Sequence, residues 1–166
     1  MSHKGRPNDG QRLNVLNAYF YVKLPMQKVE HIGIAVRDFA TAVPLFEKLF
    51  GSSCYKTETV DSEQVNTAFF RVGETKIELL ESNSADGIVA GYINKKGEGL
   101  HHIAFEVHDI RAEMKRLKEQ GFLLLQEEPK LGADNKLICF LHPKHTSGVL
   151  VELCMEVPVD ENSLNQ

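Results

Sequence analysis

The chain has 166 residues, 42% of them hydrophobic and 25% charged, which suits one globular domain or two small fused halves. A formal net charge of −4 argues against a broad nucleic-acid-binding surface, and no apolar run approaches the roughly 20 residues that span a bilayer. We therefore expect no nucleic-acid or membrane partner. The three cysteines lack CxxC spacing, which favours a reducing compartment: the cytoplasm, or the mitochondrial matrix in a eukaryote.

Residues 1–26 are less regular than the rest and are expected to form an N-terminal extension. Basic residues outnumber acidic ones at its start, which is compatible with a mitochondrial presequence. An extra N-terminal strand or arm is the other interpretation. We expect a single domain over 27–155 and a C-terminal tail over 156–166.

The first half of the domain begins with "HIGIAVRD" (31–38), whose alternation predicts a strand. Apolar residues at helical spacing follow from Phe39 to Phe50, with Asp38 placed to cap the helix start and Gly51 its end. A strand and then a hairpin that turns at Gly73-Glu74 complete the half, at 55–60 and 69–81.

The second half repeats this order. "HIAFEVHD" (102–109) matches the first strand and is followed by a helical pattern from Ile110 that ends before Gly121. A strand is predicted at 122–129 and a hairpin at 138–154. The polar segment 83–98 reads as a connector, so the modules are expected at about 27–82 and 99–155.

The repeat indicates which of two adjacent histidines serves a site. In a regular strand, neighbouring side chains point to opposite faces. His102 is equivalent to His31, and both share a face with small residues, so that face forms a hollow. The same alternation predicts that His101 points the other way.

Four polar residues fall at matching places in the two halves. His31 and His102 open the first strands, while Glu78 and Glu152 lie in the last strands, within "IEL" and "VEL". Singly, each is more often an ordinary strand residue. Together they form a candidate divalent-metal site, because imidazole plus carboxylate suits Mn, Fe, Co, Ni or Zn.

Longer stretches resemble the vicinal oxygen chelate, or glyoxalase-like, superfamily, and within it the methylmalonyl-CoA epimerase family. They are "EHIGIAVRDFATAVPLFEKLFG", "VGETKIELLES", "GEGLHHIAFEVHDI" and "FLHPKHTSGVLVEL". The resemblance implies an α+β fold in which two tandem βαβββ modules form an open, cupped sheet around a metal. It also implies interconversion of (2R)- and (2S)-methylmalonyl-CoA, through removal of the C2 proton and a metal-stabilised enolate.

The resemblance further implies that His31, Glu78, His102 and Glu152 hold one divalent ion per chain. We expect Co²⁺, with Mn²⁺, Ni²⁺ and Zn²⁺ as alternatives. Glu78 stands where the family has Gln or Glu, and both offer an oxygen ligand. The family assigns the position of Glu152 a second role, as a catalytic base.

Other roles are less directly indicated. Thr67 occupies the place where one family member has a second catalytic Glu, so Glu63 is the candidate replacement, with another polar group or bound water as the alternatives. Lys130 and Lys144 are candidate contacts for the phosphates of the acyl-CoA substrate. We expect a homodimer. The alternatives are a lactoylglutathione lyase-like isomerase and a non-catalytic small-ligand-binding protein of the same fold.

Overall fold

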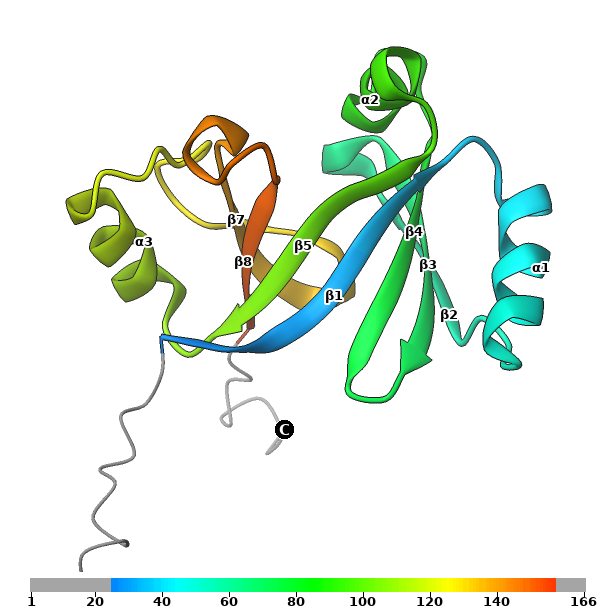
Figure 1. The fold of residues 1–166 in the computed structure, drawn as a ribbon, viewed down its shortest axis with the longest axis horizontal. Helices are drawn as coiled ribbons and strands as arrows, with labels where there is room; N and C mark the ends of the chain where they lie inside the picture. The colour runs from blue at the N-terminus through cyan, green and yellow to red at the C-terminus, as the bar shows by residue number, and fades with distance from the viewer. Residues whose placement is uncertain (1–24, 158–166) are drawn as a thin grey trace, which may run out of the picture.

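The computed structural model describes residues 25–157 as one curved, eight-stranded sheet flanked by helices (Figure 1). Residues 1–24 and 158–166 lie outside the described residues, and with them most of the predicted N-terminal extension and C-terminal tail. The strands follow the order β2-β3-β4-β1-β5-β8-β7-β6. Their bounds are β1 Met26–Val36, β2 Lys56–Val60, β3 Val65–Val72, β4 Thr75–Ser82, β5 Gly99–Val107, β6 Lys130–Leu131, β7 Lys136–Leu141 and β8 Val151–Glu156.

The strand order divides the sheet into two equivalent halves. β1 pairs in parallel with β4, and β5 pairs in parallel with β8. The halves meet where β1 and β5 run antiparallel. This is the predicted α+β architecture of two tandem βαβββ modules around a cupped sheet, with β1 and β5 along the junction.

Two helices form as the sequence predicts. α1 (Phe39–Phe50) and α3 (Ile110–Glu119) each begin after an aspartate that accepts a backbone N–H bond. The Asp38 carboxylate accepts from Thr41 at 2.7 Å, and the Asp109 carboxylate accepts from Ala112 at 3.0 Å. Such caps satisfy N–H groups that have no partner inside the helix. α1 and α3 lie at opposite sides of the molecule (Figure 1).

Each of these helices packs on the outer face of its own module. α1 covers a cluster that includes the fully buried Phe70 and Leu79, and α3 covers one that includes Leu153. The inner face of the sheet carries smaller clusters. Truncation of a fully buried Phe or Leu typically costs about 2–5 kcal/mol, so the outer clusters carry much of the stability. The inner face is thereby left for a cavity.

Two details of the second half differ from the predictions. The strand predicted at 122–129 is wrong: only Leu124 makes an isolated bridge there, and β6 is two residues long. The Gln126 side chain accepts the Phe140 N–H at 2.7 Å, taking a donor that a paired strand would use. Glu127 and Glu128 form ion pairs with α3 instead.

The connector holds a helix that polarity alone did not reveal. α2 (Ile88–Lys96) buries Val89 and Ile93 against the inner face of the first module. Short 3-10 turns complete the described chain, namely η2 Asp61–Glu63, η3 Ala133–Asn135 and η4 Pro143–His145. Among the described helices, none is long and apolar enough to cross a membrane.

Candidate active site

The two central strands place the histidines by a reciprocal arrangement. In the β1–β5 register, His31 lies opposite Ala104 and His102 lies opposite Gly33. Each histidine therefore faces the small residue that follows the other histidine by two positions. Gly33 is needed for this, because a Cβ there would lie 2.3 Å from the His102 ring.

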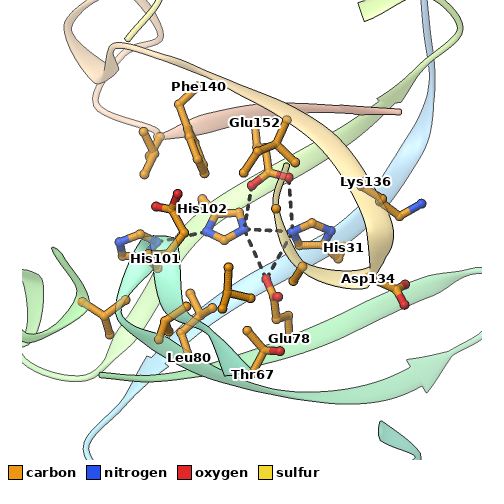
Figure 2. A pocket seen from close by; sticks show the side chains of 18 of the residues that line it. His31, Thr67, Glu78, Leu80, His101, His102, Asp134, Lys136, Phe140 and Glu152 are labelled. Atoms are coloured by element: carbon orange, nitrogen blue, oxygen red, sulfur yellow. Dashed lines mark hydrogen bonds and ion pairs between the residues drawn. The ribbon is translucent and has the colours of Figure 1, made fainter. Parts of the chain in front are cut away.

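The outer parallel strands add one carboxylate each. Glu78 on β4 lies beside Gly33, and Glu152 on β8 lies beside Ala104. The glutamates therefore flank the histidine pair from opposite modules, as the equivalent positions in the repeat predict. All four side chains are buried, and they converge on one point (Figure 2).

Donor atoms of His31, His102 and Glu152 all lie within 4.8 Å of one another, as ligands of one metal ion would, and Glu78 lies close to both histidines. The His31 and His102 Nε2 atoms lie 2.9 Å apart, and a Glu78 oxygen lies 3.3 and 3.6 Å from them. Glu152 oxygens lie 3.8 Å from His31 Nε2 and 3.5 Å from His102 Nε2. Two ligands about 2.1 Å from a shared ion lie about 3.0 Å apart at a right angle and about 3.4 Å at the tetrahedral angle. The observed distances bracket these values.

The charges of the four groups are strongly coupled. Burial alone would lower the pKa of His31, but the carboxylates of Glu78, Glu152 and Glu30 outweigh it and raise the pKa to about 9. Burial, the charge of His31 and the neighbouring His101 hold the pKa of His102 well below its usual value. Burial raises the pKa of Glu78, and it raises that of Glu152 to about 8. Such a cluster retains protons that a cation would displace.

A cavity of about 150 Å³ opens beside the four side chains on the inner face of the sheet. Its wall is apolar, with Val65, Phe69, Leu80 and Phe140 among its residues, and α2 adds Ile88. An apolar cavity with a few convergent polar groups is the usual form of a small-molecule site.

His101 corrects the prediction from strand alternation. It lines the same cavity, and its Nδ1 lies 3.0 Å from Nδ1 of His102 (Figure 2). The β1–β5 register slips by one residue at this point, so that His101 is an extra residue of β5. A bulge of this kind lets two consecutive side chains face one side, which regular alternation excludes.

A second bulge brings in a residue that the sequence analysis overlooked. Glu30 is an extra residue of β1, between the pairs formed by Val29 and His31. It is 5% exposed, and its Oε2 lies 2.5 Å from His31 Nδ1. Burial would raise the pKa of Glu30, but hydrogen bonds from His31 and Lys76 lower it to about 2. The only sequence signal for Glu30 as a site residue is its charge at the start of a predicted strand.

The other predicted site residues occupy different surroundings. Glu63 lies at the end of η2 and lines the cavity, where its carboxylate pairs with Lys130. Thr67 is buried in the cavity wall and donates a hydrogen bond to the Glu58 carbonyl oxygen. Lys144 is exposed in η4 and is not among the residues that line the cavity.

Ion pairs join the two modules at one end of the cavity. Asp134 in η3 accepts from Lys56 of β2 at 2.8 Å and from Lys76 of β4 at 2.5 Å. Together with the Glu63–Lys130 pair, these contacts tie the β6–β7 segment to the first module. The sequence separations are 58 to 78 residues, so no local pattern could reveal them.

Residues 30–140 match the family model described as the Glyoxalase/Bleomycin resistance protein/Dioxygenase superfamily. The chain therefore belongs to this superfamily, in agreement with its paired modules and cupped sheet. The match spans both candidate histidines.

Curated relatives and a solved structure narrow the assignment. The chain is 42% identical over 129 residues to the uncharacterized protein YqjC of Bacillus subtilis (78% of this chain, 92% of the relative). It is 38% identical over 127 residues to the mitochondrial methylmalonyl-CoA epimerase of Homo sapiens (76% and 72%). A Streptomyces coelicolor methylmalonyl-CoA epimerase variant, solved with 2-nitronate-propionyl-CoA, is 32% identical with a TM-score of 0.77 (80% and 99%). The chain belongs to the methylmalonyl-CoA epimerase family within that superfamily.

Proposed function

We propose that the protein is a divalent-metal-dependent epimerase that interconverts (2R)- and (2S)-methylmalonyl-CoA. The observation that carries this proposal is the convergence of His31, Glu78, His102 and Glu152, two from each module, beside an apolar cavity. Family membership supplies the substrate. We propose Co²⁺ as the resident ion, because two imidazoles and two carboxylates suit borderline metals, and Mn²⁺, Ni²⁺ or Zn²⁺ would fit the same donors.

The reaction moves one proton at C2, between a thioester and a carboxylate. The ion, when bound to the four side chains, would polarise the thioester oxygen and stabilise the negative charge that forms as the proton leaves. Glu152 takes the C2 proton onto a carboxylate oxygen, leaving the electron pair delocalised into the thioester. Glu152 lines the cavity beside both histidines, which supports this role; a bound cation would lower the pKa of its carboxylate, which burial alone raises.

The opposite face of the planar intermediate needs a second acid–base group. We propose Glu63 for this role, because it lines the cavity from the first module while Glu152 belongs to the second. Its carboxylate contacts the Lys130 ammonium group at the cavity wall. In this direction Glu63 begins the step protonated: its proton passes to C2 on the opposite face and gives the other epimer, and the reverse reaction exchanges the two roles.

Proton NMR of methylmalonyl-CoA in D₂O tests the proposal. We expect the C2 proton signal to disappear with the Co²⁺-reconstituted protein and to persist with the chelated protein. A coupled mutase assay would establish that (2R) product forms. No exchange with Co²⁺, Mn²⁺, Ni²⁺ or Zn²⁺ would discard the epimerase assignment and direct attention to glutathione hemithioacetals and ligand binding.

Variants at equivalent positions sharpen this experiment. Glu152→Gln should slow exchange by about 10²–10⁴-fold, because the amide is not a base. Glu78→Gln keeps an oxygen ligand for the ion. Its rate of C2 proton exchange should therefore stay within roughly tenfold of the wild-type rate. Glu63→Gln should slow epimerisation, and full turnover by that variant would remove Glu63 from the mechanism.

We further propose that Lys130 and Lys144 contact the CoA phosphates and that the enzyme acts as a cytoplasmic homodimer, or in the mitochondrial matrix of a eukaryote. Lys130 is better placed, since it lines the cavity and remains partly exposed. A homodimer would also give a second copy the chance to cover β2 and β6, which are the edge strands of the described sheet. Sedimentation equilibrium gives the mass in solution, and a monomeric mass would contradict the dimer.

A further inference from the structure

The site contains a buried carboxylate that none of the proposed steps uses. Glu30 precedes His31 directly, and in a regular strand its side chain would point to the opposite face. The bulge in β1 turns it inward beside the imidazole. A charged side chain this deeply buried costs several kcal/mol unless it is well paired, so its partners indicate its role.

Both oxygens of Glu30 are engaged. Oε2 lies 2.5 Å from His31 Nδ1, and Oε1 lies 2.6 Å from the Lys76 ammonium group. The ammonium group of Lys136 lies 3.4 Å from the same Oε1. Lys76 is on β4 and Lys136 is on β7, so cations from both modules hold the carboxylate against one face of the site.

The geometry separates Glu30 from the ligand set. The Nε2 atom of His31 faces His102, Glu78 and Glu152, whereas Nδ1, on the other side of the ring, faces Glu30. Donor atoms of Glu30, His31 and Cys154 also lie within 4.8 Å of one another. Cys154 is a poor ligand, however, because burial raises the pKa of its thiol and the thiol donates to the Phe105 carbonyl oxygen.

In the second module, too, the side chain of the preceding residue contacts Nδ1 of the histidine, but that side chain is an imidazole. His101 is the bulged residue before His102, and the two Nδ1 atoms lie 3.0 Å apart while His102 Nε2 faces the site. In both modules, then, the residue before the candidate histidine ligand contacts Nδ1 of that histidine, and Nε2 faces the site. The partner is a carboxylate in one module and an imidazole in the other.

We infer that Glu30 is a positioning residue for the proposed metal site: it accepts the Nδ1–H of His31 and so fixes the tautomer and ring orientation that present Nε2 to the ion. The inference rests on the metal dependence in the proposed function. Partners of this kind, behind a histidine ligand, typically change metal affinity by about 10–100-fold when they are removed. Both oxygens of Glu30 are engaged by His31 and the two lysines, so we expect its effect on the ion to pass through His31.

The test compares two buried glutamates. Glu30→Gln removes the charge behind His31, while Glu113→Gln removes a similarly buried carboxylate that pairs with Arg116 on α3, outside the site. We expect Glu30→Gln to weaken Co²⁺ binding about 10–100-fold in competition with a chromophoric chelator, and Glu113→Gln to bind Co²⁺ like the wild type. Glu30→Asp, which restores the charge, should recover part of the affinity.

A second measurement needs no metal. The His31 Nδ1 proton, held in a short buried hydrogen bond, should give a far-downfield proton resonance in the wild type and the Glu113→Gln variant but not in Glu30→Gln. Wild-type Co²⁺ affinity in a folded Glu30→Gln protein would overturn the inference. So would equal losses of Co²⁺ affinity in Glu30→Gln and Glu113→Gln that follow their losses in unfolding free energy. Failure of the epimerase assignment would appear separately, as Co²⁺ binding without C2 proton exchange.

Discussion

At the scale of single residues, His31 and His102 are chemically unequal although they occupy equivalent positions. Three carboxylates surround His31 and raise its pKa to about 9, whereas burial and neighbouring imidazoles hold the pKa of His102 well below its usual value. At pH 7 without an ion, the cluster therefore keeps a proton on His31, and burial favours another on Glu152, whose pKa is about 8. A divalent cation bound at the proposed site would compete for the same lone pairs.

This predicts that Co²⁺ binding at pH 7 releases at least one proton. Both groups have pKa values above 7, so the metal-free protein is protonated below about pH 8–9 and the affinity should rise with pH until that range. For each proton released, the affinity should change about tenfold per pH unit. Titration calorimetry in two buffers of different ionisation enthalpy measures the release. A binding heat that is the same in both buffers would contradict the prediction.

At the scale of elements, the close approach of β1 and β5 depends on Gly33. An alanine Cβ there would lie 2.3 Å from the His102 ring, and the ring cannot remain in place. We expect Gly33→Ala to weaken Co²⁺ binding by at least about tenfold, comparable with the loss of a ligand-orienting contact. Titration with Co²⁺ and a competing chelator measures the change.

Gly91 in α2 provides the control for that substitution. Apart from its chain neighbours and the backbone of α2 itself, no described atom lies within 4 Å of a Cβ built at Gly91, and helical Gly→Ala exchange typically stabilises a protein by about 0.4–1 kcal/mol. Gly91→Ala should therefore bind Co²⁺ normally and resist urea slightly better. If Gly33→Ala binds Co²⁺ as tightly as Gly91→Ala does, His102 does not depend on the small residue opposite.

The sequence predicted the elements that have local or repeated signals. Prediction failed where a bulge in a strand, or a contact between residues far apart in the chain, determines the position of a side chain. Alternation and capping predicted α1, α3 and the two hairpins, and the repeat brought together the four candidate ligands. Strict alternation then misplaced His101 and hid Glu30, because a bulge leaves no mark in the residue types. The ion pairs of Asp134 could not be predicted either, since its partners lie in the other module.

At the scale of the whole molecule, Lys130 stands where the modules meet at the cavity. It pairs with Glu63 of the first module and remains partly exposed, so an incoming phosphate could share its charge. We expect Lys130→Met to raise KM for the CoA thioester by roughly tenfold, the size of one charge-assisted hydrogen bond. The KM for a pantetheine thioester, which lacks the nucleotide phosphates, should change far less.

Lys144→Met is the companion variant, because Lys144 is exposed and is not among the cavity-lining residues. A contact to the far end of CoA would raise KM for the CoA thioester alone, without a change in kcat. Equal increases in KM for the CoA and pantetheine thioesters would show that a lysine acts on the shape of the cavity and not on phosphate.

The bulge at Glu30 also determines which changes β1 can accept. The number of residues in β1 fixes which of its side chains face the inner side of the sheet, because one additional residue shifts the alternation. A substitution in "EHIGIAV" alters one side chain, whereas the loss of a single residue would reverse the orientation of a whole stretch. Two related chains could therefore share almost every letter of this strand and still differ in whether they can assemble the site, while others with many substitutions but the same spacing would retain it.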